Sequence, residues 1–448
     1  MGLLPFSFDG LAPQLATAAG LWWIWLPIML IVIFQQIWLV YAQTKFKAAT
    51  DWALLEIRIP RELKRTPKAM EQIFAGIHSL RNAPGDFVET YLDGEVTYWF
   101  SLEIVSFSGD IHFYVRTPTK YRNIVESFFY AQYPDIQIAD ASDADYMTTL
   151  PRTHRQIEES GLRLWGTELK LAKDDAYPIR TYIEFSSPVE EEQLDPVSAL
   201  TELLGKVRRG EKIFIQMLIR PADETWIHKS NALLKQLKES TALRPKAATA
   251  EQAASFTAIQ RTPGETDLLK AIDRNLTKPG FETIIRVMYM ATKEVYSVNL
   301  VRRGVYSCFN QYAVASMNSF KQNANVRTEA RWSSFPYFFP NRRRAAKERR
   351  IWRNFRERRM PDKGTVTGLA GSGMLASLLA QSSTFVLNTE ELATIWHLPS
   401  HLVLTAPFVR RVESRKMGPP AGLPIFGGEE ETPWTNKKGE KHQAGDKP

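Results

Sequence analysis

The chain has 448 residues, 57 Lys and Arg against 49 Asp and Glu, a formal net charge of +8, and 44% hydrophobic residues. At about 150 residues per domain, this length predicts two or three domains, and the composition excludes a wholly disordered, collagenous or polytopic membrane protein. The single cysteine, Cys308, excludes an internal disulfide framework and a multi-cysteine zinc module.

Residues 21–41 are predicted to form a transmembrane helix, which leaves residues 1–20 as an extracytoplasmic N-terminus. The segment is almost continuously apolar, and its 21 residues, at about 1.5 Å each, match a hydrocarbon core of roughly 30 Å. Aromatic residues at both ends are typical of the two membrane interfaces. These membrane-interface residues are Trp22, Trp23, Trp25, Trp38 and Tyr41.

The flanking charges predict the orientation of this helix. Residues 1–20 contain no Lys or Arg, whereas Lys45, Lys47 and Arg58 follow the helix. Because basic flanks stay in the cytoplasm, we expect a single-pass protein with its N-terminus outside and its body cytoplasmic. A cleaved signal peptide is the alternative, but the chain lacks a basic leader and the apolar run is too long for one.

Residues 50–142 are predicted to form a ferredoxin-like unit with the order β-α-β-β-α-β. Thr66-Pro67 is a helix start, with a hydroxyl cap followed by proline, and residues 119–132 form the second helix. Alternating apolar residues predict the strands. They are Trp52–Ile59, Tyr98–Phe107, Ile111–Arg116 and Ile136–Ile138.

Residues 160–330 are predicted to repeat this α/β unit in diverged form, with an insertion at 221–262. Extended segments and helices again alternate, although no sequence repeat proves the duplication. A helix is expected from about Val295 to Phe320. The extended segments are Leu162–Leu171, Arg180–Phe185, Lys212–Arg220 and Phe281–Met290. The fold class is therefore α+β, with two ferredoxin-like units and an irregular C-terminal region.

The net charge belongs to one Arg-rich segment, residues 341–359. This segment contains ten Lys or Arg and two Glu, whereas the other 429 residues carry 47 basic and 47 acidic side chains. A helix here can bind nucleic-acid phosphates, lie on an anionic membrane with Trp352 and Phe355 as wedges, or pair with an acidic protein. The candidate contacts are Arg342, Arg343, Arg344, Lys347, Arg349, Arg350, Arg353, Arg356, Arg358 and Arg359.

No motif in the chain predicts catalysis, a cofactor or a metal site. Gly368–Gly373 has the glycine spacing of a phosphate-binding loop, but Met374 and Leu375 replace its Lys and Ser/Thr. His397 and His401 are four residues apart, but the proline between them breaks the helix that would align them. We therefore expect a non-enzymatic protein.

Several stretches together resemble the membrane-proximal half of type IV secretion and conjugation-type ATPases, in particular bacterial versions classed as a domain of unknown function. The segment 387–399 (LNTEELATIWHLP) is the most specific, because in full-length relatives it precedes the nucleotide-binding motor. The other matching stretches are Ile57–Glu62, Thr66–Glu71, Phe100–Val105, Ile111–Pro118, Tyr121–Pro134 and Thr262–Glu265.

The resemblance implies a non-catalytic inner-membrane component of a type IV secretion-like or conjugation-like apparatus. The chain stops at Pro448, where the motor would begin, so the resemblance implies a motor that is either encoded separately or absent. In the first case the implied partner is a separately encoded motor ATPase. It would dock on residues 384–425, with residues 427–448 as a disordered tail. The expected docking residues are Asn388, Glu391, Trp396, His397 and Pro399. The bilayer is a further partner, and DNA, anionic lipid and a second copy of the chain stay open. A membrane-tethered nucleic-acid-binding protein is the alternative function.

Overall fold

The computed structural model describes residue 20 and residues 22–60, 63, 65–185, 194–242, 262–332, 337–361, 382–400 and 411–412. The first described element, α2 (Trp22–Ala49), is a 28-residue helix. Its segment Leu26–Ala49 is long and apolar enough to cross a membrane. This confirms the predicted apolar helix, which continues eight residues beyond its expected end.

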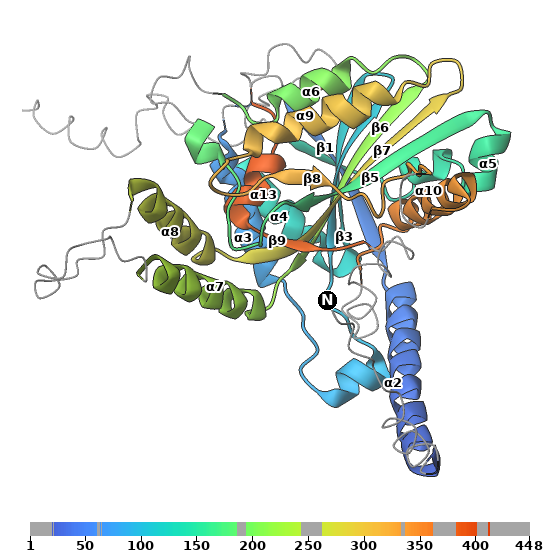
Figure 1. Cartoon of the computed structure of the whole chain (residues 1–448). Helices are drawn as coiled ribbons and strands as arrows, with labels where there is room; N and C mark the ends of the chain where they lie inside the picture. The colour runs from blue at the N-terminus through green and yellow to red at the C-terminus, as the bar shows by residue number, and fades with distance from the viewer. Residues whose placement is uncertain are drawn as a thin grey trace, which may run out of the picture. The chain divides into compact units, whose positions relative to one another are not determined.

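The first half of the body has the strand order β4-β1-β3-β2, with every neighbouring pair antiparallel (Figure 1). Two helices connect these strands, so the β-α-β-β-α-β prediction is confirmed. The elements are β1 (Trp52–Pro60), α3 (Pro67–Ser79), β2 (Phe100–Phe107), β3 (Asp110–Pro118), α4 (Arg122–Gln132) and β4 (Gln137–Asp140). Short helical turns supplement them at η2 (Glu89–Asp93), η3 (Thr119–Tyr121) and η4 (Tyr146–Thr149).

The second half repeats this arrangement, because its strand order β8-β5-β7-β6 is the same order shifted by four strands. An insertion of two helices separates β6 from β7, where the first unit has a tight hairpin. The strands are β5 (Leu162–Leu171), β6 (Glu211–Pro221), β7 (Gly280–Thr292) and β8 (Phe320–Gln322). The helices are α5 (His154–Glu159), α6 (Ser198–Gly205), α7 (Thr225–Ala242), α8 (Pro263–Leu276) and α9 (Tyr306–Phe309). Turns η5 (Tyr182–Phe185), η7 (Leu300–Val305) and η8 (Asn310–Tyr312) complete this half.

The two units share one continuous sheet. Strands β2 and β6 pair antiparallel from Phe100–Ile219 to Phe107–Lys212, and they occupy equivalent positions in the two units. The C-terminal part adds β9 (Phe385–Asn388), which pairs with β7, and β10 (Arg411–Val412), which pairs with β1. The described residues from 20 to 412 consequently form one compact unit.

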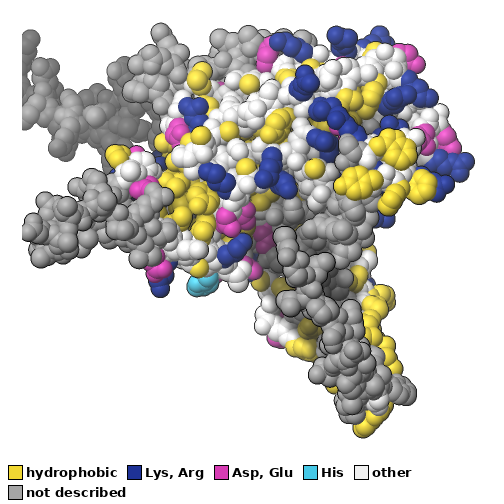
Figure 2. All heavy atoms as spheres, in the orientation of Figure 1, with side chains coloured by type: hydrophobic (Ala, Val, Ile, Leu, Met, Phe, Trp, Pro, Cys, Tyr) yellow, Lys and Arg dark blue, Asp and Glu magenta, His cyan; other side chains and the backbone are white. Residues whose placement is uncertain are grey.

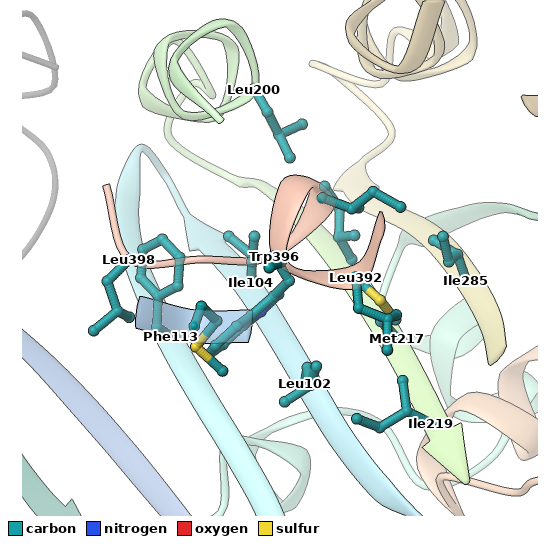
Figure 3. Close-up of a cluster of buried hydrophobic side chains, with 14 of the residues drawn as sticks. Leu102, Ile104, Phe113, Leu200, Met217, Ile219, Ile285, Leu392, Trp396 and Leu398 are labelled. Atoms are coloured by element: carbon teal, nitrogen blue, oxygen red, sulfur yellow. The ribbon is translucent and has the colours of Figure 1, made fainter. Parts of the chain in front are cut away.

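Helices cover both faces of the sheet, which explains why its central strands are apolar along almost their whole length. One face packs against α3, α4, α6, α9 and the short helix α13 (Thr389–Ile395). In Figure 3, Trp396 and Leu392 lie among Leu102, Met217 and Ile219 from the strands. The other face packs against η4, α5 and the helix α10 (Pro340–Arg356).

Three local predictions are wrong. The helix expected from Val295 to Phe320 is shorter, because an irregular segment separates η8 from the three-residue strand β8. Arg180–Phe185 ends in a turn of 3-10 helix instead of forming a strand. Thr66 precedes α3 as expected, and Pro67 begins it, but the Thr66 hydroxyl makes no capping hydrogen bond.

Candidate functional site: the Arg-rich helix and the charges beneath it

The apolar side of α10 is part of the protein core. Ile351, Trp352 and Phe355 are each at most 1% exposed and pack with Phe214 on β6. The Trp352 indole also donates a hydrogen bond to the carbonyl of Pro151 at 3.2 Å. In this structure Trp352 and Phe355 are therefore core residues of the sheet face, which contradicts their expected role as membrane wedges.

Arg358 lies just after α10 and is buried between two carboxylates. Its guanidinium binds Glu103 at 2.7 and 3.0 Å and Asp145 at 2.6 and 3.1 Å. Burial acts to raise the pKa of Glu103, but Arg358 and hydrogen bonds from Ser101 and Tyr146 outweigh it and hold the pKa below its ordinary value. Arg358 is consequently a structural cation, not an exposed phosphate contact.

A row of buried polar side chains crosses the sheet beneath α10. Glu103 on β2, Gln216 on β6, Arg286 on β7 and Glu168 on β5 are successive cross-strand neighbours. Gln216 donates to Glu103 at 3.1 Å. Arg286 donates to Gln216 at 3.1 Å and to Glu168 at 3.0 Å. Each bond replaces a contact with water that burial removes, so the row is a connected structural network.

This polar row also binds the C-terminal end of α10. Gln216 donates to the Phe355 carbonyl at 3.1 Å, and Arg286 donates to the Asn354 and Arg359 carbonyls at 3.3 and 2.7 Å. The last carbonyls of a helix have no partners within the helix, and a cation there is favourable. The sheet thus fixes where α10 ends and which of its arginines face outward.

Sequence reasoning missed this row, although a signal for it was present. Glu103, Gln216 and Arg286 each stand between two apolar residues of their strands, and Glu168 stands between Thr167 and Leu169. A single polar residue inside a strand that is apolar on both sides indicates a buried partner. Only the pairing of the strands shows that the four lie in one row.

The exposed basic surface is narrower than the predicted one. Its exposed members are Arg342, Arg344, Arg349, Arg353 and Arg359. The others are at least partly covered by the body: Arg343, Lys347, Arg350, Arg356 and Arg358. Lys347 donates to the Ala324 carbonyl at 3.1 Å. Burial, with Arg343 and Arg327 nearby, lowers its pKa to about 8. Arg356 donates to two backbone carbonyls of the 150–151 turn.

Aromatic side chains lie exposed at the start of α10. Tyr337, Phe338 and Phe339 are 57–64% exposed, and the Arg342 guanidinium lies 5.3 Å from the Phe339 ring centroid. Figure 2 shows hydrophobic and basic side chains side by side over this part of the surface. We call the exposed arginines Arg342, Arg344, Arg349 and Arg353, together with these aromatics, the α10 outer surface.

The predicted docking residues lie in the core. Asn388, Glu391, Trp396 and His397 are at most 4% exposed, and Pro399 is buried as well. Asn388 and Glu391 form a capping box, because Asn388 Oδ1 accepts from the Glu391 amide at 2.8 Å and Glu391 Oε2 accepts from the Asn388 amide at 2.9 Å. These side chains hold α13 against the sheet and leave no surface for a partner. Residues 401–410 and 413–425 of the same segment lie outside the described residues.

His397 is paired with Asp195 in the core. Its Nε2 lies 2.9 Å from Asp195 Oδ1, and its Nδ1 lies 2.8 Å from the Ala393 carbonyl oxygen. Both ring nitrogens face hydrogen-bond acceptors, one a carboxylate and the other a backbone carbonyl. The pair joins α13 to the segment before α6.

The aromatics predicted at the membrane interfaces lie on α2. Trp23 and Tyr41 are about 60% exposed, whereas Trp38 donates from its indole nitrogen to the Tyr91 carbonyl at 2.6 Å. Trp22 and Trp25 belong to the same helix, but their side chains lie outside the described ones. The aromatics of both predicted interfaces are thus on one continuous helix.

The described residues contain no group of three or more His, Cys, Asp or Glu side chains placed to hold a metal ion. Cys308 is buried, and burial raises the pKa of its thiol to about 11. Neutral pH therefore leaves it protonated, in a poor state for nucleophilic attack. The glycine-rich segment 368–373 lies outside the described residues.

Comparison with known protein families gives one match. A family model described as "Domain of unknown function (DUF8128)" matches residues 41–409. This range starts inside α2 and covers both ferredoxin-like units, α10 and α13. The family's description names no activity and links the chain to no secretion or conjugation ATPase. No curated protein matches the sequence.

Proposed function

The chain belongs to the DUF8128 domain family, and we propose that it is a non-catalytic, single-pass protein of the inner membrane. In this proposal the N-terminus is outside and the body is cytoplasmic, where it serves as platform for a separate motor ATPase in a type IV secretion-like or conjugation-like apparatus. The observation that carries the proposal is the joining of one apolar helix to a compact body with an exposed basic surface.

The compact, single-sheet body supports a platform role. Ten strands form one sheet, helices cover both of its faces, and internal hydrogen bonds link the polar row beneath α10. Buried pairs of this kind fix an arrangement more than they provide a reactive centre. The charged groups of the row are therefore assigned to positioning α10.

The α10 outer surface is the best candidate for docking the partner. The segment 388–399, which the family resemblance favours, is buried, whereas the outer arginines lie exposed beside aromatic rings. Arginine and aromatic side chains are the residue types that contribute most to protein interfaces. We therefore assign the motor protein an acidic surface that faces these arginines.

Co-purification from native membranes tests this assignment. The triple variant Arg342→Gln, Arg349→Gln, Arg353→Gln should recover far less of an ATPase or secretion component than the wild-type chain. The matched control, Lys229→Gln, Lys235→Gln, Lys238→Gln, removes the same number of exposed charges from α7 and should recover it unchanged. Recovery of no ATPase or secretion component by the wild-type chain would contradict the proposed function.

The alternative function is membrane-tethered binding of nucleic acid, and one observation favours it. Three exposed aromatic rings, Tyr337, Phe338 and Phe339, precede the outer arginines. Such rings can stack on unpaired bases while arginines contact phosphates. Single-stranded DNA should then bind with a steep salt dependence. The same triple Arg→Gln variant should reduce the slope of log K against log salt by about 2, because each lost phosphate contact contributes about 0.7.

A further inference from the structure

A short segment beside α2 has the form of an amphipathic helical turn. Residues 86–93 (DFVETYLD) enclose η2 and end at Gly94, which adopts a left-handed conformation with φ of 66°. Asp86 caps the turn, since its carboxylate accepts from the Glu89 amide at 2.8 Å and its carbonyl accepts from the Thr90 hydroxyl at 2.8 Å. The segment is thus held in shape by its own hydrogen bonds.

Large apolar side chains of this segment face outward. Phe87, Val88 and Leu92 are 67%, 50% and 61% exposed, and Phe87 stacks on Tyr91 with ring centroids 4.6 Å apart. Residues 87, 88, 91 and 92 share one side of a helical turn because of their spacing. An exposed cluster of this kind on an otherwise well-packed body indicates an interaction surface.

The segment is attached to α2 at one end of the apolar helix. The Trp38 indole donates to the Tyr91 carbonyl at 2.6 Å, and a side chain at Gly94 would lie 2.3 Å from the Ala42 carbonyl carbon. Figure 1 shows the short helical turn side by side with α2. Trp38 and Tyr41 are the aromatics predicted at the cytoplasmic interface. The exposed apolar surface of α2 therefore continues onto Phe87, Val88 and Leu92 at the level of the headgroups.

We propose that the 86–93 segment is a second membrane contact, which inserts Phe87, Val88 and Leu92 into the boundary between headgroups and acyl chains around α2. The proposal rests on the proposed membrane anchoring of α2. The segment carries Asp86, Glu89 and Asp93, so its insertion depends on apolar burial and not on anionic lipid. Two contacts, one spanning and one interfacial, would fix the tilt of the cytoplasmic body relative to the membrane plane.

Site-directed spin labelling of the full-length chain in phosphatidylcholine vesicles tests the proposal. Cys308 is the sole cysteine, so the background is Cys308→Ala, and labels are placed with Leu92→Cys, Asp93→Cys or Val32→Cys. At position 92 we expect collisions with oxygen to exceed those with a water-soluble nickel chelate. Position 93, on the polar side, should show the reverse. Position 32, inside α2, should report the bilayer core.

The three labels separate the possible failures. If position 32 reports water, the membrane anchoring of α2 is wrong and the second contact fails with it. If position 32 reports the bilayer core while position 92 matches position 93, only the second contact is overturned. A spectrum at position 92 that is broadened by neighbouring labels, and that sharpens when unlabelled chain is added, would show that a second copy covers the segment. This result also overturns the proposal.

Discussion

Arg358 shows how much one buried residue contributes to the fold around α10. It pairs with Glu103 and Asp145, and no other described cation binds either carboxylate at salt-bridge distance. We predict that Arg358→Ala lowers the free energy of unfolding by about 3–5 kcal/mol, because it leaves a buried carboxylate unpaired. Chemical denaturation of the full chain in detergent micelles measures the loss. The matched control, exposed Arg353→Ala, should change it by less than about 0.5 kcal/mol; equal losses in the two variants would contradict the buried role.

The Asp195–His397 pair predicts a pH dependence at the same scale. Burial acts to raise the pKa of Asp195, but the charge and hydrogen bond of His397, with amide hydrogen bonds from Ser400 and Val197, lower it from 3.8 to about 2. Because the folded-state pKa is depressed, the stabilisation is present above about pH 4 and is lost as the pH falls toward 2.

Asp195→Asn tests this dependence. The wild-type chain should lose on the order of 2 kcal/mol from this group between pH 4 and 2, which corresponds to a pKa shift of nearly two units. The variant should be less stable at neutral pH and should lack this component of the acid limb. Denaturation curves at several pH values measure the free energy of unfolding of each protein. An equal loss of this free energy between pH 4 and 2 in the two proteins would disprove the assignment.

At the scale of elements, α10 is a core helix with one basic side. We predict that Trp352→Ala lowers the free energy of unfolding by about 3–5 kcal/mol, because the side chain is 1% exposed and leaves a cavity against the sheet. A membrane wedge would instead lose affinity for vesicles and keep its stability. Thermal denaturation and vesicle flotation of the variant, each compared with wild type, distinguish the two roles.

Local patterns predicted most elements correctly, whereas the roles of charged residues depend on distant partners. Alternation of apolar residues identified β1 and β5 because their side chains pack on a sheet. The three-residue strand β8 was missed, since so short a segment carries no periodicity. Arg358 was predicted to contact phosphates because it lies in a charged segment. Its partner Glu103 lies 255 residues away in the chain, so only the folded sheet shows that it is buried.

The same reasoning explains the outcome for the candidate docking segment. The capping box of Asn388 and Glu391 is a local motif, which the spacing of the two residues alone can indicate. The burial of Trp396 is a tertiary property, since its ring packs 6.1 Å from Phe113 on β3. A helix that carries a recognisable motif can therefore pack in the core instead of binding a partner.

At the scale of the whole molecule, the attachment of α2 to the body would determine how firmly a membrane-spanning α2 fixes the orientation of the body relative to the membrane. Gly94 lies where the chain leaves the 86–93 segment and contacts the backbone of Ala42. Its φ of 66° is a left-handed conformation that residues with a β-carbon rarely adopt. Its close approach to Ala42 also leaves no room for a β-carbon. Beyond it, Phe46 of α2 packs on Tyr98 with ring centroids 5.7 Å apart.

We predict that Gly94→Ala separates α2 from the body without unfolding the sheet. The added methyl carbon would lie 2.3 Å from the Ala42 carbonyl carbon. The nearest atoms all belong to the backbone of Ala42 and Gln43, so no side-chain rotation can relieve the clash. Spin labels on α2 and β3 should then report a broader distance distribution than in wild type, with an unchanged unfolding midpoint for the body. The matched control is Gly264→Ala, where nothing lies within 4 Å of the added carbon and φ is not left-handed. An unchanged distance distribution in Gly94→Ala would mean that other contacts hold α2, and the two-point attachment to the membrane would lose its mechanical basis.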